Sequence, residues 1–185
     1  SQIFLLIIIG MEADFGYVSA GAAAAGIGVL YMARGFGSGA GPLLARPLMT
    51  VPRYMPYIIG LSLGGAGLLY VGVSQFEWGM WTLICVFCSH GCSGVSWVFS
   101  TTLLQQRTDN DWMGRVAGTD NLLIVLTMGT STIAGGYILE EELLTLREIL
   151  LVTGLIQIGV GALWLTLVSP REKIFFASQK LGQTQ

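Results

Sequence analysis

Long apolar runs alternate with short polar connections along this chain of 185 residues. Five runs stand out: Ala20–Leu44, Tyr54–Ser74, Gly79–Leu103, Val116–Leu139 and Ile149–Ser169. At about 1.5 Å of rise per residue, about 20 helical residues cross a hydrocarbon core of about 30 Å. Lipid offers no hydrogen-bond partners to the backbone, so each run should form a helix. The pattern predicts an all-α, polytopic membrane helix bundle, with one transmembrane domain over residues 1–185 and no soluble domain.

The beginning of the chain departs from this pattern. Ile3–Gly10 is apolar but too short to cross a membrane. It lacks the basic flank and the small-residue cleavage site of a signal peptide. We therefore expect a fragment that begins inside a helix, which makes six helices when this stump is counted.

The basic residues mark alternate connections. Arg46 and Arg53 flank the first connection, Arg107 and Arg115 flank the third, and Arg171, Lys173 and Lys180 follow the last run. Cytoplasmic connections of membrane proteins are rich in Lys and Arg, whatever the net charge, which is −2 here. We therefore expect these connections and the tail, 170–185, in the cytoplasm, with seven of the nine basic residues. The acidic connections at Glu77 and Glu140–Glu142 should lie outside.

Proline and glycine shape the helix ends and contacts. Prolines at 42, 47, 52 and 56 should end one helix and start the next, and Pro170 should end the last helix. The residues beyond it, Ile174–Phe176, suit either a frayed terminus or a short interfacial helix. Glycines four residues apart let helices in lipid approach closely, and the first long run holds the pairs Gly35 with Gly39 and Gly37 with Gly41. We expect these four glycines at helix contacts, in an interface that either slides or packs statically.

Two segments resemble the major facilitator superfamily. Residues 33–46, ARGFGSGAGPLLAR, are similar to the eighth helix of that family's exporter-like branch, which includes macrolide-efflux and siderophore-exporter permeases. Residues 103–107, LLQQR, and 111–116, DWMGRV, resemble the cytoplasmic loop between its tenth and eleventh helices. Arg46 and Arg53 then flank a degenerate counterpart of the family's loop motif, and Asp111, Gly114 and Arg115 belong to the second match.

The resemblance implies a fold and a function. Residues 1–10 would be the end of helix seven of twelve, and 20–44, 54–74, 79–103, 116–139 and 149–169 would be helices eight to twelve. The missing partner would be the N-terminal six-helix half of the same transporter, and the location a bacterial inner membrane. The implied activity is proton-driven antiport, with efflux of a small amphipathic or anionic molecule by alternating access.

Charged side chains inside the runs are the main candidates for a substrate pathway. Arg34 lies twelve residues before Arg46, about 18 Å along a helix and so near mid-membrane. In the functional alternative it binds an anion or gates the pathway. In the structural alternative it forms a buried ion pair or a snorkelling contact. Asp120 is either a proton-coupling carboxylate or, as we favour, a structural pairing or gating group, with Arg34 or a basic loop of the missing half as its partner. Asn121 suits a hydrogen bond across helices, and Asp111 an N-cap for a helix that starts at Trp112.

Other candidates have weaker support. His90 lies among Cys85, Cys88 and Cys92, a set that suits copper or zinc, but His90 is off the cysteine face, so we expect no metal and no cofactor. Trp97, Phe99, Tyr137, Gln157 and Trp164 line an apolar substrate cavity or merely face lipid and neighbouring helices. Trp78, Trp81 and Trp112 suit interface anchors.

The sequence also excludes some classes of function. It contains no basic face with interleaved aromatics for nucleic acid. It contains no nucleophile–base pair, phosphate loop or paired-carboxylate site, so we do not expect an enzyme. The alternative to a transporter is a non-transporting truncated membrane protein or a helix-packing assembly partner.

Overall fold

The computed structural model describes residues 22–172, and these residues form helices joined by short connections. In chain order the α-helices are α2 (Ala22–Ala45), α3 (Met55–Gln75), α4 (Met80–Arg107), α5 (Asn110–Glu140) and α6 (Leu146–Leu163). Two 3-10 turns, Arg46–Thr50 and Pro52–Tyr54, join α2 to α3, and a π-helical turn, Trp164–Val168, extends α6. The all-helical prediction is confirmed for the described residues. The stump at Ile3–Gly10 and the Ile174–Phe176 segment lie outside them.

Four helical stretches in the described part of the chain are long and apolar enough to cross a membrane. They are Pro52–Gln75, Met80–Arg107, Asn110–Glu140 and Leu146–Glu172. The expected first run, α2, has the required length at 24 residues but is not among these four, and it contains Arg34 and several glycines. By length and composition, these four helices are those of an integral membrane protein.

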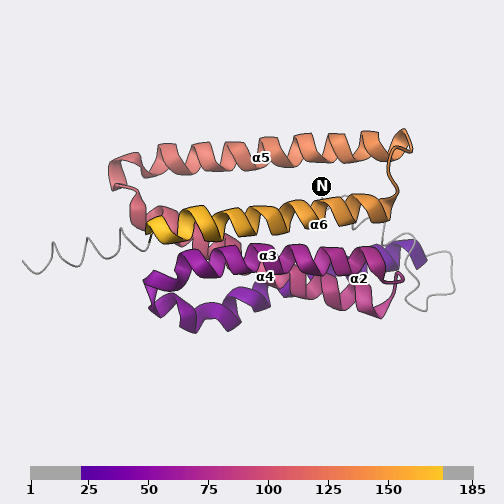
Figure 1. Cartoon of the computed structure of the whole chain (residues 1–185), viewed down its shortest axis with the longest axis horizontal. Coiled ribbons are helices and arrows are strands. Elements are labelled where there is room, and N and C mark those ends of the chain that lie inside the picture. The colour runs from indigo at the N-terminus through magenta and orange to yellow at the C-terminus, as the bar shows by residue number, and fades with distance from the viewer. Residues whose placement is uncertain (1–21, 173–185) are drawn as a thin grey trace, which may run out of the picture.

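Successive helices run in opposite directions, so the connections alternate between the two ends of the bundle (Figure 1). The connection between α2 and α3, that between α4 and α5, and the end of α6 lie at one end. These segments carry Arg46, Arg53, Arg107, Arg115 and Arg171. The structure thus gathers them at one end, and the assignment of that end to the cytoplasm stays a prediction.

Glycine-lined contacts pack α3 against α6 and α2 against α4, and α3 also packs on α4. A Cβ atom built on Gly67 would lie 2.6 Å from the Gly154 carbonyl oxygen, and one on Gly161 would lie 2.7 Å from the Gly64 nitrogen. The α3–α6 backbones therefore approach so closely that no side chain fits between them. At the α2–α4 contact a Cβ on Gly41 would lie 2.1 Å from the Gly91 carbonyl oxygen.

The expected glycine pairs of α2 divide between two faces. Gly37 and Gly41 lie against the α4 backbone, whereas a Cβ on Gly35 or Gly39 would meet nothing within 4 Å. The packing expectation therefore does not extend to Gly35 and Gly39 within residues 22–172. The reason is rotational: residues two apart on a helix are about 200° apart around its axis.

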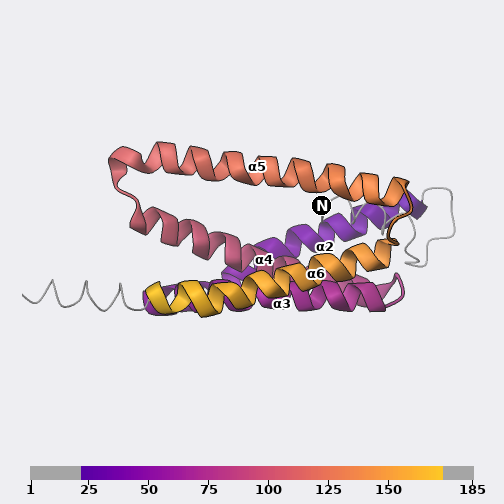
Figure 2. The same cartoon turned by 45° about the horizontal axis from the view of Figure 1, so that its top comes forward.

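Helix α5 stands apart from the other four (Figures 1 and 2). Only 6% of its most apolar stretch is buried, against 44% for α4. Gly135 is its one buried residue. A helix this apolar and this exposed is covered by lipid or by further protein.

Helix ends differ from the expected bounds where local chemistry overrides hydropathy. Helix α6 begins at Leu146 because Thr145 and Glu148 form a capping box: the Glu148 N–H bonds the Thr145 hydroxyl at 3.3 Å, and the Thr145 N–H bonds the Glu148 carboxylate at 2.8 Å. The helix does not end at Pro170 as expected, since helical residues continue to Glu172. The π turn precedes this proline, with the Ser169 N–H bonded to the Trp164 carbonyl.

Pro42 also departs from its expected role, since it lies inside α2 instead of ending it. Proline has no N–H to bond the carbonyl four residues earlier, which is that of Ser38. That carbonyl faces Gly94 of α4, on which a Cβ would lie only 2.4 Å away. The glycine therefore makes room for the free carbonyl and for the proline ring.

Candidate functional site

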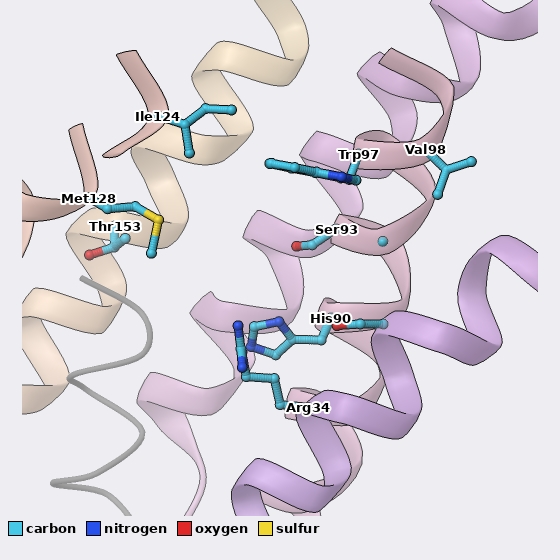
Figure 3. Close-up of a pocket in the computed structure, with 10 residues that line it drawn as sticks. Arg34, His90, Ser93, Trp97, Val98, Ile124, Met128 and Thr153 are labelled. Carbon is cyan, nitrogen blue, oxygen red and sulfur yellow. The ribbon is translucent and has the colours of Figure 1, made fainter. Parts of the chain in front are cut away.

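A cavity of about 580 Å³ opens between α2, α4, α5 and α6. Its size lies in the range of small-molecule binding sites, about 300–1,000 Å³. Figure 3 shows Arg34 and His90 side by side at one end and Trp97 farther along α4, opposite Ile124 and Met128. The lining residues are Arg34, Ser38, His90, Ser93, Gly94, Trp97, Val98, Ile124, Met128 and Thr153.

Helical spacing brings the polar side of this cavity together. Residues 93, 94 and 97 of α4 come three, four and seven residues after His90, so all four share one face of the helix. Arg34 and Ser38 are four apart on α2 and share a face for the same reason. Because glycines let α2 and α4 pack closely, both of these faces border the same cavity.

Arg34 lies halfway along α2, which runs from Ala22 to Ala45. Its side chain is half-buried, and its Nε atom is buried without a hydrogen-bond partner. The guanidinium carbon lies 5.9 Å from the centre of the Tyr31 ring, a distance at which a cation is attracted to the ring face. No Asp or Glu is among the cavity-lining residues of the described chain, so nothing there neutralises Arg34.

His90 is held in place from α3. The Tyr70 hydroxyl and His90 Nε2 lie 3.1 Å apart in a hydrogen bond, and the two rings meet edge to face with centroids 6.2 Å apart. Tyr70 is fully buried. The residue before His90, Ser89, donates its hydroxyl to the Ala66 carbonyl of α3 at 3.2 Å. With Nε2 engaged by Tyr70, Nδ1 is the ring nitrogen left for other partners.

Sequence reasoning missed His90 as part of this site because it grouped the residue with the neighbouring cysteines. Cys85 is buried, Cys88 is exposed, and Cys92 is half-buried. Within residues 22–172 no three His, Cys, Asp or Glu side chains are arranged to hold a metal ion. The spacing of His90 from Ser93 and Trp97 was the signal that could have found its role.

Among the aromatic candidates, Trp97 alone lines the cavity, with 57% of its surface exposed. Phe99 is fully buried in the core cluster of Met55 and Ile59. The indole N–H of Trp164 donates to the Pro56 carbonyl at 2.8 Å, which fixes the end of α6 on the start of α3. Tyr137 is exposed on α5, and neither it nor the half-buried Gln157 is among the lining residues. Of the five candidates, this cavity of the described chain therefore brings in only Trp97, and for Phe99 and Trp164 the helix-packing alternative applies.

Asp120 lies at a second cavity, of about 380 Å³, which Arg107, Trp164 and Glu172 also line. Arg107 forms an ion pair with Glu172, which joins the end of α4 to the end of the α6 helix. Asp120 and Arg34 line separate cavities, and no ion pair joins them in the described chain. Pairing of Asp120 with Arg34 is therefore not found, whereas pairing with a basic loop of the missing half, gating and proton coupling stay predictions. Asn121 is exposed on α5.

The residues of the loop motifs lie on the surface at the basic end. The Arg53 guanidinium lies 4.7 Å from the Tyr54 ring, and that of Arg115 lies 5.0 Å from the Trp112 ring. Arg46, Asp111 and Gly114 are exposed.

The N-cap expected at Asp111 is wrong, because α5 begins at Asn110 with Asp109 at the N-cap position. The Asp109 carbonyl accepts the Trp112 N–H at 3.0 Å. Asp111 lies in the first turn of α5, where its negative charge interacts favourably with the positive end of the helix dipole.

No known protein family, curated protein or solved structure matches this chain.

Proposed function

We propose that this chain is part of a secondary active transporter that exports a small amphipathic or anionic molecule by alternating access. The observation that supports this most is the cavity around Arg34. A charge at the middle of a membrane helix is costly, and such residues commonly line a pathway. Here the charge borders a cavity of ligand size, together with His90, Ser93 and Trp97.

The packing of the helices is compatible with movement of this site. Transporters of this class form their substrate sites near the bilayer midplane, between two sets of helices that rock against each other. The cavity is bounded on one side by α5, which has few contacts with the bundle. The proposed partner is the N-terminal half of the same transporter, in the exporter-like branch of the major facilitator superfamily that the sequence resembles.

The test is accumulation of dyes, macrolides and siderophores in cells that express the protein containing this chain. Wild type should lower the accumulation of at least one compound, and Arg34→Ala should abolish that effect at equal membrane expression. Arg171→Ala is the matched control, since it removes an exposed arginine near the end of the last helix that lines none of these cavities. Accumulation in wild-type cells equal to that in empty-vector cells across the panel would refute export of these compounds.

Proton coupling is tested separately in proteoliposomes. Dissipating the proton gradient should abolish uphill transport. Uphill transport that continues after every ion gradient is removed would refute secondary coupling.

The exposure of α5 favours a second candidate, a non-transporting assembly partner. Its apolar residues Leu122, Leu123 and Ile133 are all more than half exposed, which suits a surface that packs on other membrane helices. This candidate predicts that Arg34→Ala and Arg171→Ala behave alike in every transport assay, whereas charged substitutions along α5 break a complex.

A further inference from the structure

We infer that the Arg34 cavity recognises a singly charged carboxylate carried on an apolar or aromatic body. This inference rests on the proposed function in that it names the substrate class of the same site. It follows from three features of the cavity: a cation with no acidic residue beside it in the described lining, neutral hydrogen-bond donors, and an apolar wall opposite.

The cation is the first feature. The Arg34 guanidinium brings one positive charge to a cavity whose described lining holds no acidic residue. Its Nε is buried and has no acceptor. An unpaired donor of a charged group in a low-dielectric site is unfavourable until an acceptor arrives, and an anion supplies both the acceptor and the opposite charge. A cation would be repelled at the same place.

The chemistry of the head group is the second feature. The planar fork of arginine matches two oxygens of a carboxylate. Ser38 and Ser93 add hydroxyl groups, and the Nδ1 side of His90 faces away from its bond to Tyr70. One arginine and neutral donors balance one negative charge, so a dianionic phosphate would remain half-neutralised. The structure therefore favours a monocarboxylate.

The wall is the third feature. Trp97 exposes 57% of its surface, and Ile124 and Met128 of α5 line the cavity across from it (Figure 3). An indole face and a thioether are good partners for an aromatic or aliphatic body. Because Trp97 is seven residues, or about 10 Å, beyond His90 on α4, the body must extend away from the head group along the helix.

The experiment compares ligands that share one body and differ only in the head. The chain is purified in phosphatidylcholine nanodiscs, and binding is measured by calorimetry at pH 7 with empty nanodiscs subtracted. The probes are 2-naphthoate, 2-naphthyl phosphate, 2-naphthylmethylamine and 2-naphthalenemethanol. We expect 2-naphthoate to bind about 10- to 100-fold more tightly than the alcohol, as charge-assisted hydrogen bonds imply. The phosphate should bind less tightly than the carboxylate, and the amine should bind least.

Variants locate the effect. Arg34→Gln should remove the preference for 2-naphthoate over the alcohol, and Arg34→Lys should keep part of it because the charge remains but the fork is lost. Trp97→Ala should weaken all four probes alike. Arg115→Gln removes the same charge from the surface and should change nothing.

Two outcomes would overturn the inference. The first is that the wild-type protein binds the alcohol or the amine as tightly as 2-naphthoate. This test needs no variant. The other is a preference for the carboxylate that survives in Arg34→Gln or that is lost equally in Arg115→Gln. Selective binding without transport in cells would instead refute the proposed export and leave the carboxylate site standing. Transport of neutral or cationic compounds without selective binding would refute the carboxylate site and leave the proposed export standing.

Discussion

Replacing glycine by alanine along α2 should have opposite effects on its two faces. At Gly41 the added Cβ would lie 2.1 Å from the Gly91 carbonyl oxygen, whereas ordinary contacts begin near 3.4 Å. The neighbouring atoms are backbone, which cannot rotate away, so α2 and α4 must separate by about 1.3 Å at this point. At Gly39 the same methyl group would meet nothing within 4 Å.

The magnitudes follow from these distances. Overpacking of a close contact costs about 1–3 kcal/mol. Alanine in place of glycine inside a helix gains up to about 1 kcal/mol, because it restricts the unfolded backbone. Gly41→Ala should therefore lower the free energy of unfolding by about 0–3 kcal/mol, and Gly39→Ala should raise it by up to about 1 kcal/mol.

The assay is reversible unfolding of the chain in mixed micelles, followed by circular dichroism as the fraction of denaturing detergent rises. The two variants differ by the same methyl group, two residues apart on the same helix, so helix propensity cancels in the comparison. Gly37→Ala and Gly35→Ala repeat the test one turn earlier, with 2.2 Å to the Phe87 carbonyl oxygen at Gly37 and open space at Gly35. A Gly41→Ala protein as stable as Gly39→Ala would refute the close approach of α2 and α4.

Three further predictions concern the ends of the bundle. Arg147→Ala should lower the free energy of unfolding by about 1–3 kcal/mol, because Arg147 donates to the Ser74 and Phe76 carbonyls at 2.9 and 2.8 Å. Chemical unfolding measures this, and Arg147→Lys should recover only part of the loss. A double-mutant cycle with Arg107→Ala and Glu172→Ala should give a coupling of about 0.5–1 kcal/mol, since both side chains remain partly exposed at 21% and 25%. A coupling of zero would mean that the ion pair adds no stability. In a cysteine-free background, a cysteine at Thr50 should resist a membrane-impermeant thiol reagent in intact cells, whereas one at Glu141 should react. The reverse pattern would overturn the predicted orientation.

Hydropathy was sufficient to place the helices of this protein but not to say which faces meet. The run expected at 116–139 lies within α5, and those expected at 54–74 and 79–103 begin one residue before α3 and α4, because helix length and backbone satisfaction in lipid depend only on local composition. The bounds moved where specific polar groups act, as with Thr145 and Glu148 at the start of α6. A hydropathy pattern cannot resolve such ends.

The candidate site shows the same division. Arg34 was identifiable from sequence as a charge near mid-membrane, and Trp97 as a possible cavity residue. That His90 lies beside Arg34, while Asp120 borders a different cavity, is decided by how α2, α4 and α5 are rotated and paired.

The amino-acid sequence by itself determined that this is an α-helical membrane protein with its basic connections at alternate turns. Only the tertiary structure decided that Gly67 meets Gly154, that Gly41 rather than Gly39 faces α4, and that the apolar surface of α5 stays uncovered in the described chain. The physical reason is that lipid is as apolar as the inside of the bundle. A membrane helix therefore needs no apolar stripe to mark its packed face, and close contacts between small residues take that role.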